Sequence, residues 1–99
     1  MKKVIFSDVT ARDGLQSLQK VFSVTQRSNL IESISNCGFT EIEVGSLVNP
    51  KVMPQMSKSI NVYKQTLSPS QFKSFVLAGN EKSIKEINEN NIKYFSLFT

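Results

Sequence analysis

Hydrophobic and polar positions along the chain follow two different periods. Short apolar runs rich in β-branched and aromatic residues predict strands at residues 3–9, 40–45, 72–77 and 92–98. Between these runs, apolar residues recur every three or four positions, which predicts amphipathic helices. Because a helix connects each strand to the next, neighbouring strands are predicted to run parallel and to form an α/β fold.

The first predicted helix has sequence signals at both ends. Ser23 and Gln26 have the spacing of a capping box, and Gly38 is a natural end. Its predicted apolar face consists of Leu30, Ile31, Ile34 and Cys37. The only cysteine, Cys37, is therefore expected to be a small buried apolar residue and not a nucleophile.

Two further helices follow the proline-bearing segment "SLVNPKVMPQM". Asn80 is placed to cap the last helix, and Ile84 and Ile87 are predicted to point inward. The apolar positions of the preceding helix are Met56, Ile60, Tyr63 and Leu67. The whole pattern reads strand, helix, strand, helix, strand, helix, strand.

Length and composition indicate one folded domain covering residues 1–99. Apolar residues make up 39% of the 99 residues and charged residues 20%, as in ordinary globular proteins. There is no histidine, so the commonest general base and metal ligand is missing. No apolar run approaches the length of a membrane span or a secretory leader, so a cytoplasmic protein without membrane partners is expected.

The formal net charge of +4 permits anionic ligands. The lysines are scattered, however, and the aromatic residues do not alternate with arginines. Nucleic-acid binding is therefore not expected. A small anionic ligand needs only a few well-placed cations.

The segment "TARDG" places two opposite charges directly after the first predicted strand. Asp13 supplies the oxygen donor that Mg²⁺ and Mn²⁺ prefer. Arg12 is suited to hold a carboxylate or to stabilise an oxygen that becomes negative during a reaction. The alternative is a surface turn, because Asp13 and Gly14 form a sequence that favours tight turns.

Alternation along the second predicted strand separates two faces. Ile42 and Val44 are predicted to lie under the helices, while Glu41, Glu43 and Gly45 point to the other side of the sheet. In a barrel that side is the interior, where a carboxylate near the carboxyl end of a strand meets the active site. Glu43 is the better placed of the two glutamates. The alternative is the solvated face of an edge strand.

Taken together, "DVTARDGLQ" and "EIEVGSLVNPKVMPQM" resemble the first two strand-end motifs of the 3-hydroxy-3-methylglutaryl-CoA lyase family. This family belongs to the metal-dependent (β/α)₈-barrel lyases and condensing enzymes. The resemblance implies the first half of a TIM barrel, with about four strands and three helices. It also implies carbon–carbon lyase activity, a retro-Claisen cleavage of 3-hydroxy-3-methylglutaryl-CoA into acetyl-CoA and acetoacetate.

The resemblance also implies a role for each motif residue. Asp13 would be a ligand of the divalent cation, Mg²⁺ or Mn²⁺, which chelates the substrate's hydroxyl and carboxylate oxygens. Arg12 would bind the acyl-CoA substrate and stabilise the enolate that forms at the thioester carbonyl. Glu43 would orient the substrate or move a proton. Gln16 and Ser46 would contact the substrate, with the "NPK" loop closing the edge of the site.

Length sets this chain apart from the family, because a complete barrel takes ~250 residues. The family's histidine pair and asparagine, which complete its metal site, have no counterpart here. We therefore expect a truncated family member that is incomplete as a single chain. A second polypeptide or a second copy that completes the barrel is the other interpretation. The alternative is a non-catalytic remnant, or a subunit that binds acyl-CoA or metal and needs a partner half-barrel. An unrelated flavodoxin-like domain would require a phosphate loop, which the sequence lacks.

Overall fold

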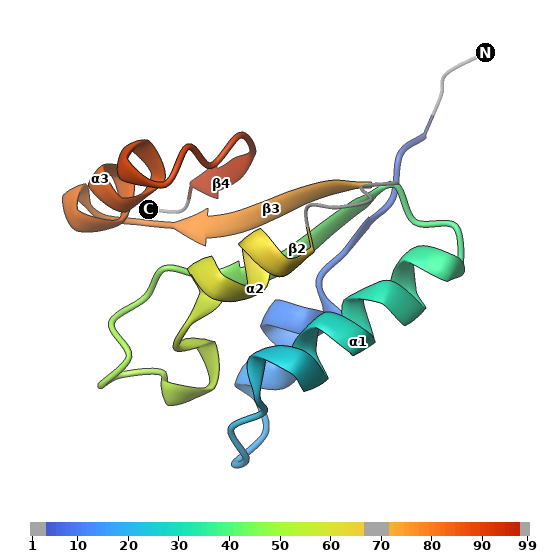
Figure 1. Ribbon diagram of the computed structural model, residues 1–99, viewed down its shortest axis with the longest axis horizontal. Helices are drawn as coiled ribbons and strands as arrows, with labels where there is room; N and C mark the ends of the chain where they lie inside the picture. Colours follow the sequence, from blue (N-terminus) through green and yellow to red (C-terminus); the bar gives the residue numbers. More distant parts are fainter. Residues whose placement is uncertain (1–3, 67–71, 98–99) are drawn as a thin grey trace.

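In the part of the chain that the structure describes, four parallel strands form one sheet in chain order. The computed structural model describes residues 4–66 and 72–97. The strands are β1 (Ser7–Asp8), β2 (Glu41–Ser46), β3 (Lys73–Ala78) and β4 (Phe95–Leu97). Each pairs in parallel with the next, so β2 and β3 lie in the centre of the sheet (Figure 1). The predicted α/β class with parallel strands is confirmed.

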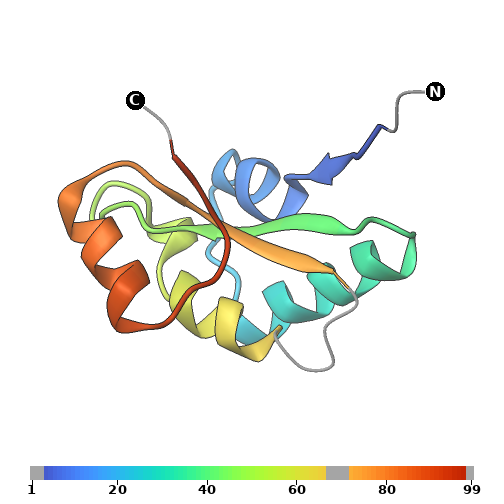
Figure 2. The same cartoon turned by 90° about the horizontal axis from the view of Figure 1, so that it is seen from above.

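The helices lie on one face of this sheet. They are α1 (Val24–Asn36), α2 (Ser59–Gln65) and α3 (Glu81–Glu89). A five-residue helical turn, η1 (Thr10–Gly14), lies on the opposite face, as Figure 2 shows. A 3₁₀ turn, η2 (Pro54–Met56), precedes α2. Within residues 4–66 and 72–97, no helix is both long enough and apolar enough to cross a membrane.

The hydrophobic core lies between the sheet and the three helices. Ile42 and Val44 of β2 are fully buried, as predicted, and so is Val76 of β3. The Tyr63 hydroxyl of α2 accepts the Lys93 N–H at 3.0 Å, which ties the segment before β4 to the same layer. The other core residues of the sheet and the helices are Ile31, Val62, Tyr63, Ala78, Ile87 and Ile92, and Ala11 of η1 belongs to the same buried cluster.

A β-bulge interrupts the alternation of β2. Glu43 pairs with Phe75, but the next pair is Gly45 with Val76, so Val44 is an extra residue. Paired residues of neighbouring strands share a face, so Gly45 lies on the helix face. The prediction that Gly45 shares the face of the glutamates is therefore wrong, because the extra residue shifts the alternation by one position.

The first strand is shorter than the predicted 3–9. Only Ser7 and Asp8 pair with β2, whereas the apolar side chains of Val4, Ile5 and Phe6 remain exposed. β1 is an edge strand, and the described part of the chain offers no strand on its other side. Val4, Ile5 and Phe6, which the sequence predicted to lie in a strand, therefore lack a neighbouring strand to pack against.

The second helix begins later than its apolar pattern suggests. Lys58 adopts a left-handed conformation with φ 59°, which separates the 3₁₀ turn containing Met56 from α2. Ile60 and Tyr63 pack on the core as predicted. Leu67 lies outside the described residues.

The inward positions of α3 differ from the prediction. Ile84 is 38% exposed, whereas Ser83 and Ile87 are buried. The Ser83 hydroxyl accepts the N–H groups of Gly79 and Asn80 in the capping box, which fixes the rotation of the helix. Because Ser83 and Ile87 are four residues apart, they share the buried face, and Ile84 falls at its edge.

The end of α1 also differs in one respect. Gly38 ends the helix with φ +97°, as predicted. Cys37, expected to be buried, is exposed, because α1 ends at Asn36 and Cys37 is the C-cap, where the chain turns away.

Replacing Ser23 by alanine is expected to lower the free energy of unfolding by about 1 kcal/mol. The Ser23 hydroxyl accepts the Gln26 N–H at 3.0 Å, and the Gln26 side chain accepts the Ser23 N–H at 2.9 Å. Urea unfolding followed by circular dichroism measures the change. Ser33→Ala is the matched control, since Ser33 lies exposed inside α1 and alanine favours helix there. Equal losses in both variants would show that the cap contributes nothing.

Candidate functional site

The turn η1 places charged side chains over the glutamate face of the sheet. It follows β1 directly, and the Asp8 carboxylate accepts the Thr10 N–H at 2.9 Å. The carbonyl of Val9 accepts the N–H groups of Arg12 and Asp13 at 3.1 and 2.7 Å. Ala11 is fully buried and anchors the turn. The direction of the "RDG" backbone is thus fixed by its own hydrogen bonds.

Arg12 joins two carboxylates at this edge of the sheet. Its Nε donates to Glu43 Oε1 at 3.0 Å, and its Nη1 donates to Asp13 Oδ1 at 3.3 Å. The side chains of Arg12 and Glu43 are 18% and 13% exposed, while that of Asp13 is 68% exposed. One guanidinium between two carboxylates leaves a formal charge of −1, so a cation would be attracted here.

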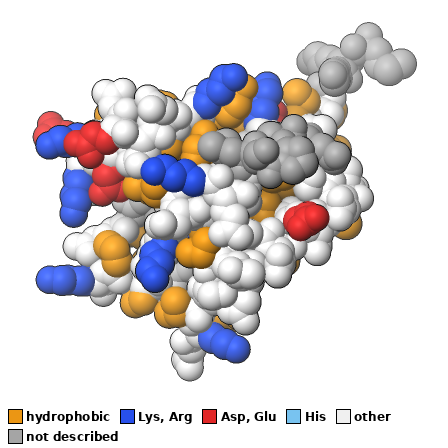
Figure 3. Space-filling view, in the orientation of Figure 1, with side chains coloured by type: hydrophobic (Ala, Val, Ile, Leu, Met, Phe, Trp, Pro, Cys, Tyr) orange, Lys and Arg blue, Asp and Glu red, His pale blue; other side chains and the backbone are white. Residues whose placement is uncertain are grey.

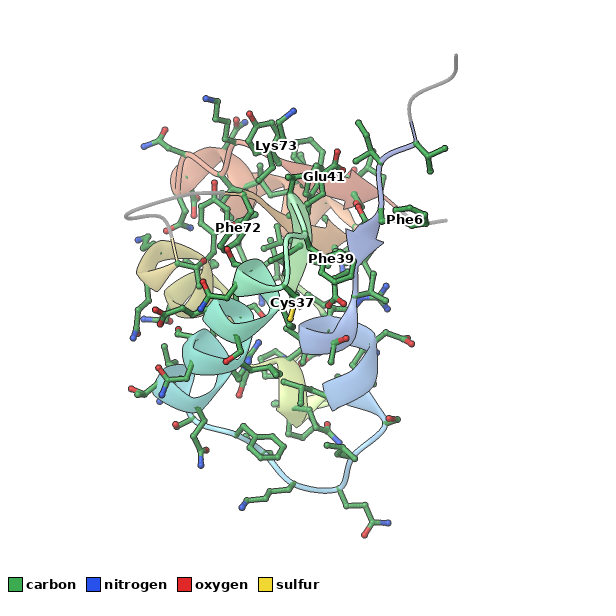
Figure 4. All side chains as sticks on the ribbon, turned by 90° about the vertical axis from the view of Figure 1, so that its right-hand side faces the viewer. Phe6, Cys37, Phe39, Glu41, Phe72 and Lys73 are labelled. Carbon is green, nitrogen blue, oxygen red and sulfur yellow. The ribbon has the colours of Figure 1, made fainter. Side chains whose placement is uncertain are left out.

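The two glutamates of β2 have different surroundings. Glu43 meets Arg12, whereas Glu41 accepts a hydrogen bond from the Ser7 hydroxyl at 3.2 Å. Glu41 pairs in register with Lys73 at the opposite, amino end of the strands, where both are labelled in Figure 4. The structure therefore places Glu43 with the charged residues of η1, as the sequence predicted, and leaves Glu41 away from them.

Gln16, the predicted substrate contact, follows η1. Its Oε1 atom is buried and has no hydrogen-bond partner among the described residues. A buried acceptor without a donor is costly, so a ligand that donates a hydrogen bond would be favoured at this point. The Gln55 amide donates to the Leu18 carbonyl at 2.5 Å, which joins the second motif segment to the residues directly after the first.

Ser46 reaches the site only because of the β2 bulge. It pairs with Leu77, two residues after Phe75, which pairs with Glu43. Ser46 and Glu43 therefore lie on the same face of the sheet. Strict alternation from Glu43 would have turned Ser46 toward the helices.

Two buried residues near this site were not predicted from the sequence. Arg27 of α1 is 1% exposed, and Ser59 of α2 is 3% exposed. Burial lowers the pKa of the Arg27 guanidinium, because desolvation disfavours its charged form. The spacing along the sequence could have indicated the burial of Arg27. It precedes Leu30, Ile31 and Ile34 by three, four and seven residues, so it lies on the apolar face of the helix.

A groove of about 330 Å³ at the other end of the sheet lacks comparable chemistry. Its lining residues are Val4, Ile5, Phe6, Cys37, Gly38, Phe39 and Thr40, none of which carries a carboxylate or a cation. Figure 4 shows Phe6, Cys37 and Phe39 at this amino end of the strands. On the face drawn in Figure 3, Lys and Arg side chains are spread over several elements instead of forming one patch.

The site's capacity for a metal ion rests on Asp13. Its exposed carboxylate is a hard oxygen ligand of the kind that Mg²⁺ and Mn²⁺ take. Among residues 4–66 and 72–97, no three His, Cys, Asp or Glu side chains are grouped so that they could hold a metal ion. Asp13 therefore fits as one ligand of an open site, not as part of a closed cage.

Comparison with known proteins gives a consistent result. The model of the HMGL-like family matches residues 3–93. A curated 3-hydroxy-3-isohexenylglutaryl-CoA/hydroxymethylglutaryl-CoA lyase of Pseudomonas aeruginosa is 34% identical over 97 residues, which are 98% of this chain and 32% of that protein. An (R)-citramalyl-CoA lyase of Chloroflexus aurantiacus is 44% identical over 57 residues, covering 58% of this chain and 18% of the relative.

Solved structures agree with these relatives. Hydroxymethylglutaryl-CoA lyase from Pseudomonas aeruginosa superimposes with a TM-score of 0.87 at 34% identity, over 98% of this chain and 32% of the other. The lyase from Acinetobacter baumannii, solved with coenzyme A and 3-methylmalate, gives 0.84 at 28% identity, over 94% and 30%. The four strands and their helices match the amino-terminal half of that TIM barrel, as predicted. The chain spans about a third of the length of these relatives.

Proposed function

The chain belongs to the HMGL-like family. On this basis we propose that it is the part of a carbon–carbon lyase that carries the first strand-end motifs, and that this lyase acts on 3-hydroxy-3-methylglutaryl-CoA. The observation that carries the proposal is the Arg12–Glu43 ion pair, which joins the two family-like motifs at the carboxyl edge of the sheet. A surface turn would leave Arg12 in solvent, whereas here its side chain is 18% exposed.

The proposed reaction breaks the bond between C2 and C3 of the substrate. The 3-hydroxyl loses its proton, C3 becomes the ketone carbon of acetoacetate, and the bonding electron pair passes to C2. The resulting enolate of acetyl-CoA then takes up a proton. Arg12 is suited to stabilise the enolate oxygen, since a fixed guanidinium stabilises a charge that develops beside it.

Glu43 has two roles in this proposal. It holds Arg12 through the 3.0 Å hydrogen bond, and its carboxylate is available to orient the substrate or to move a proton. Gln16 and Ser46 would contact the substrate. The unpartnered Gln16 oxygen and the position of Ser46 on the Glu43 face support these assignments.

We propose that Asp13 binds a divalent cation, Mg²⁺ or Mn²⁺. When bound, the cation supplies electrostatic stabilisation of substrate oxygens. Asp13 contributes one carboxylate oxygen, and the other ligands would come from water, substrate and groups beyond the described residues. Arg12 donates to one Asp13 oxygen at 3.3 Å, which favours one orientation of the carboxylate.

A partner half-barrel belongs to the same proposal. β1 and β4 each have one strand neighbour within the described residues, and Phe95 and Leu97 of β4 are 39% and 64% exposed. Unpaired strand edges with apolar side chains are suited to further strands, from a second polypeptide or a second copy. The cytoplasmic location and the extent of a partial-barrel domain over residues 1–99 stay predictions.

Asp13→Asn is expected to weaken Mn²⁺ binding at least about tenfold, because a carboxylate ligand loses its charge. Isothermal titration of the purified chain measures the affinity. Acetoacetate release from 3-hydroxy-3-methylglutaryl-CoA, by the chain alone and mixed with the remaining two thirds of the Pseudomonas lyase, tests the reaction itself.

Three outcomes separate the functions. Release that disappears in Asp13→Asn supports the lyase. Binding of Mn²⁺ or acyl-CoA without acetoacetate release, both by the chain alone and in the mixture, supports the binding subunit. Equal Mn²⁺ affinity in wild type and Asp13→Asn would remove the proposed metal site. Lys64→Gln is the control, since this cation of α2 lies outside both motifs.

A further inference from the structure

The guanidinium of Arg27 is buried between α1 and the segment that leads into α2. Its Nη1 donates to the Ser57 carbonyl at 2.6 Å, and its Nη2 donates to the Ser59 hydroxyl at 3.1 Å. Met56 Sδ lies 4.0 Å from the same Nη2. In the described part of the chain no carboxylate forms an ion pair with Arg27, and its Nε atom has no partner.

Ser59 connects this cation to the end of β2. Its hydroxyl donates to the Met56 carbonyl at 2.6 Å and accepts from Arg27 Nη2. It also accepts the backbone N–H of Ser46 at 3.1 Å. A serine hydroxyl has one proton and two lone pairs, so its hydrogen-bonding capacity is fully used.

Stability alone does not account for a charge in this place. Taking a guanidinium out of water is costly, and apolar residues of similar size often stabilise a fold when they replace buried charges. The lowered pKa of Arg27 reflects the same desolvation, which disfavours its charged form. The polar contacts of Arg27 instead lie in residues 56–59, and one of these partners, Ser59, accepts the Ser46 N–H directly after the β2 bulge.

We propose that Arg27 and Ser59 are positioning residues for the site at the end of β2. Arg27 fixes Ser59 and the Ser57 carbonyl, and Ser59 fixes the Ser46 amide. Together they stabilise the bulge that places Ser46 on the face of Glu43. They also fix the position of the 47–58 segment where it returns to the end of β2. The inference rests on the proposed function only in so far as Ser46 and this segment contact substrate there.

Amide hydrogen exchange of Ser46, followed by NMR on the full chain without ligand, tests the inference. Ser59→Ala and Arg27→Met are each expected to accelerate exchange of the Ser46 amide about tenfold relative to Ile42, the effect of losing one hydrogen bond. Arg27→Lys, which keeps the charge but loses the planar fork, should fall between wild type and Arg27→Met. The thermal midpoint of Arg27→Met is expected to stay level or to rise.

Ser74→Ala is the matched control for Ser59→Ala. Ser74 is 4% exposed, and its hydroxyl has no partner within the described residues, so its removal should leave the Ser46 amide unchanged. Ser46 exchange within twofold of wild type in both test variants would overturn the inference. So would an acceleration that all β2 amides share along with a lower thermal midpoint, because that result shows a purely structural role.

A second arm of the experiment keeps this inference apart from the proposed function. Wild type and Arg27→Met are titrated with 3-hydroxy-3-methylglutaryl-CoA and Mg²⁺ while the amides of Arg12 and Ser46 are followed. About tenfold weaker binding by Arg27→Met would support positioning of the site. If wild type itself shows no response, the proposed function fails, and the ligand-free exchange rates still decide the role of Arg27 and Ser59.

Discussion

Arg12→Gln is expected to lower the rate of acetoacetate release by a factor of about 10²–10³, the usual effect of removing one group that stabilises a developing oxyanion. Glutamine is neutral and presents a single amide, so it cannot replace a charged fork that contacts Glu43 and Asp13 together. The rate is measured with the assay mixture in which the wild-type chain releases acetoacetate. The apparent affinity for the acyl-CoA should fall far less than the rate.

Two companion variants identify the cause of that loss. Lys20→Gln removes the same formal charge from an exposed side chain that lies over the Phe22 ring, so its rate should stay near wild type. Arg12→Gln also leaves the half-buried Glu43 carboxylate unpaired, which destabilises the fold. Combining it with Glu43→Gln should restore the thermal midpoint without restoring the rate. An unchanged rate in Arg12→Gln would exclude Arg12 from the reaction.

Gly45→Ala is expected to lower the free energy of unfolding by about 1–3 kcal/mol, the range for overpacking a tightly filled interior. A methyl group at this position would overlap the Ser59 hydroxyl, and it would lie 2.7 Å from Ser59 Cβ and 3.2 Å from Arg27 Nη2. Each kcal/mol corresponds to about 4–8 °C in the thermal midpoint of a domain of this size, which calorimetry resolves.

Gly14→Ala is the control for this substitution. The nearest atom to an added methyl at Gly14 is Thr10 Cγ2 at 3.5 Å, an ordinary contact, so the midpoint should stay level or rise slightly. If Gly45→Ala is tolerated equally well, the close approach of β2 to α2 is not a constraint. The position of Ser46 would then depend less on Ser59 than the hydrogen bonds indicate.

The sequence by itself determined the parallel α/β class, the order of the elements and most of the helix caps. These features depend on local properties: the spacing of apolar residues, the Ser23 capping box, and the positive φ of Gly38. It also predicted that Arg12, Asp13 and Glu43 lie close together, because they follow or end neighbouring apolar strands. Their roles in a reaction stay predictions. Their meeting across 31 residues follows from parallel pairing of β1 with β2.

Only the tertiary structure determined which faces of the sheet Gly45 and Ser46 occupy. It also determined that Arg27 is buried. An apolar and polar pattern assigns faces by strict alternation, and a bulge breaks that rule through contacts with residues far along the chain. The exposure of Val4, Ile5 and Phe6 has the same origin, since a strand's length depends on its neighbours as well as its own residues. Local patterns fix what a segment tends to form; packing between distant segments fixes where its side chains point.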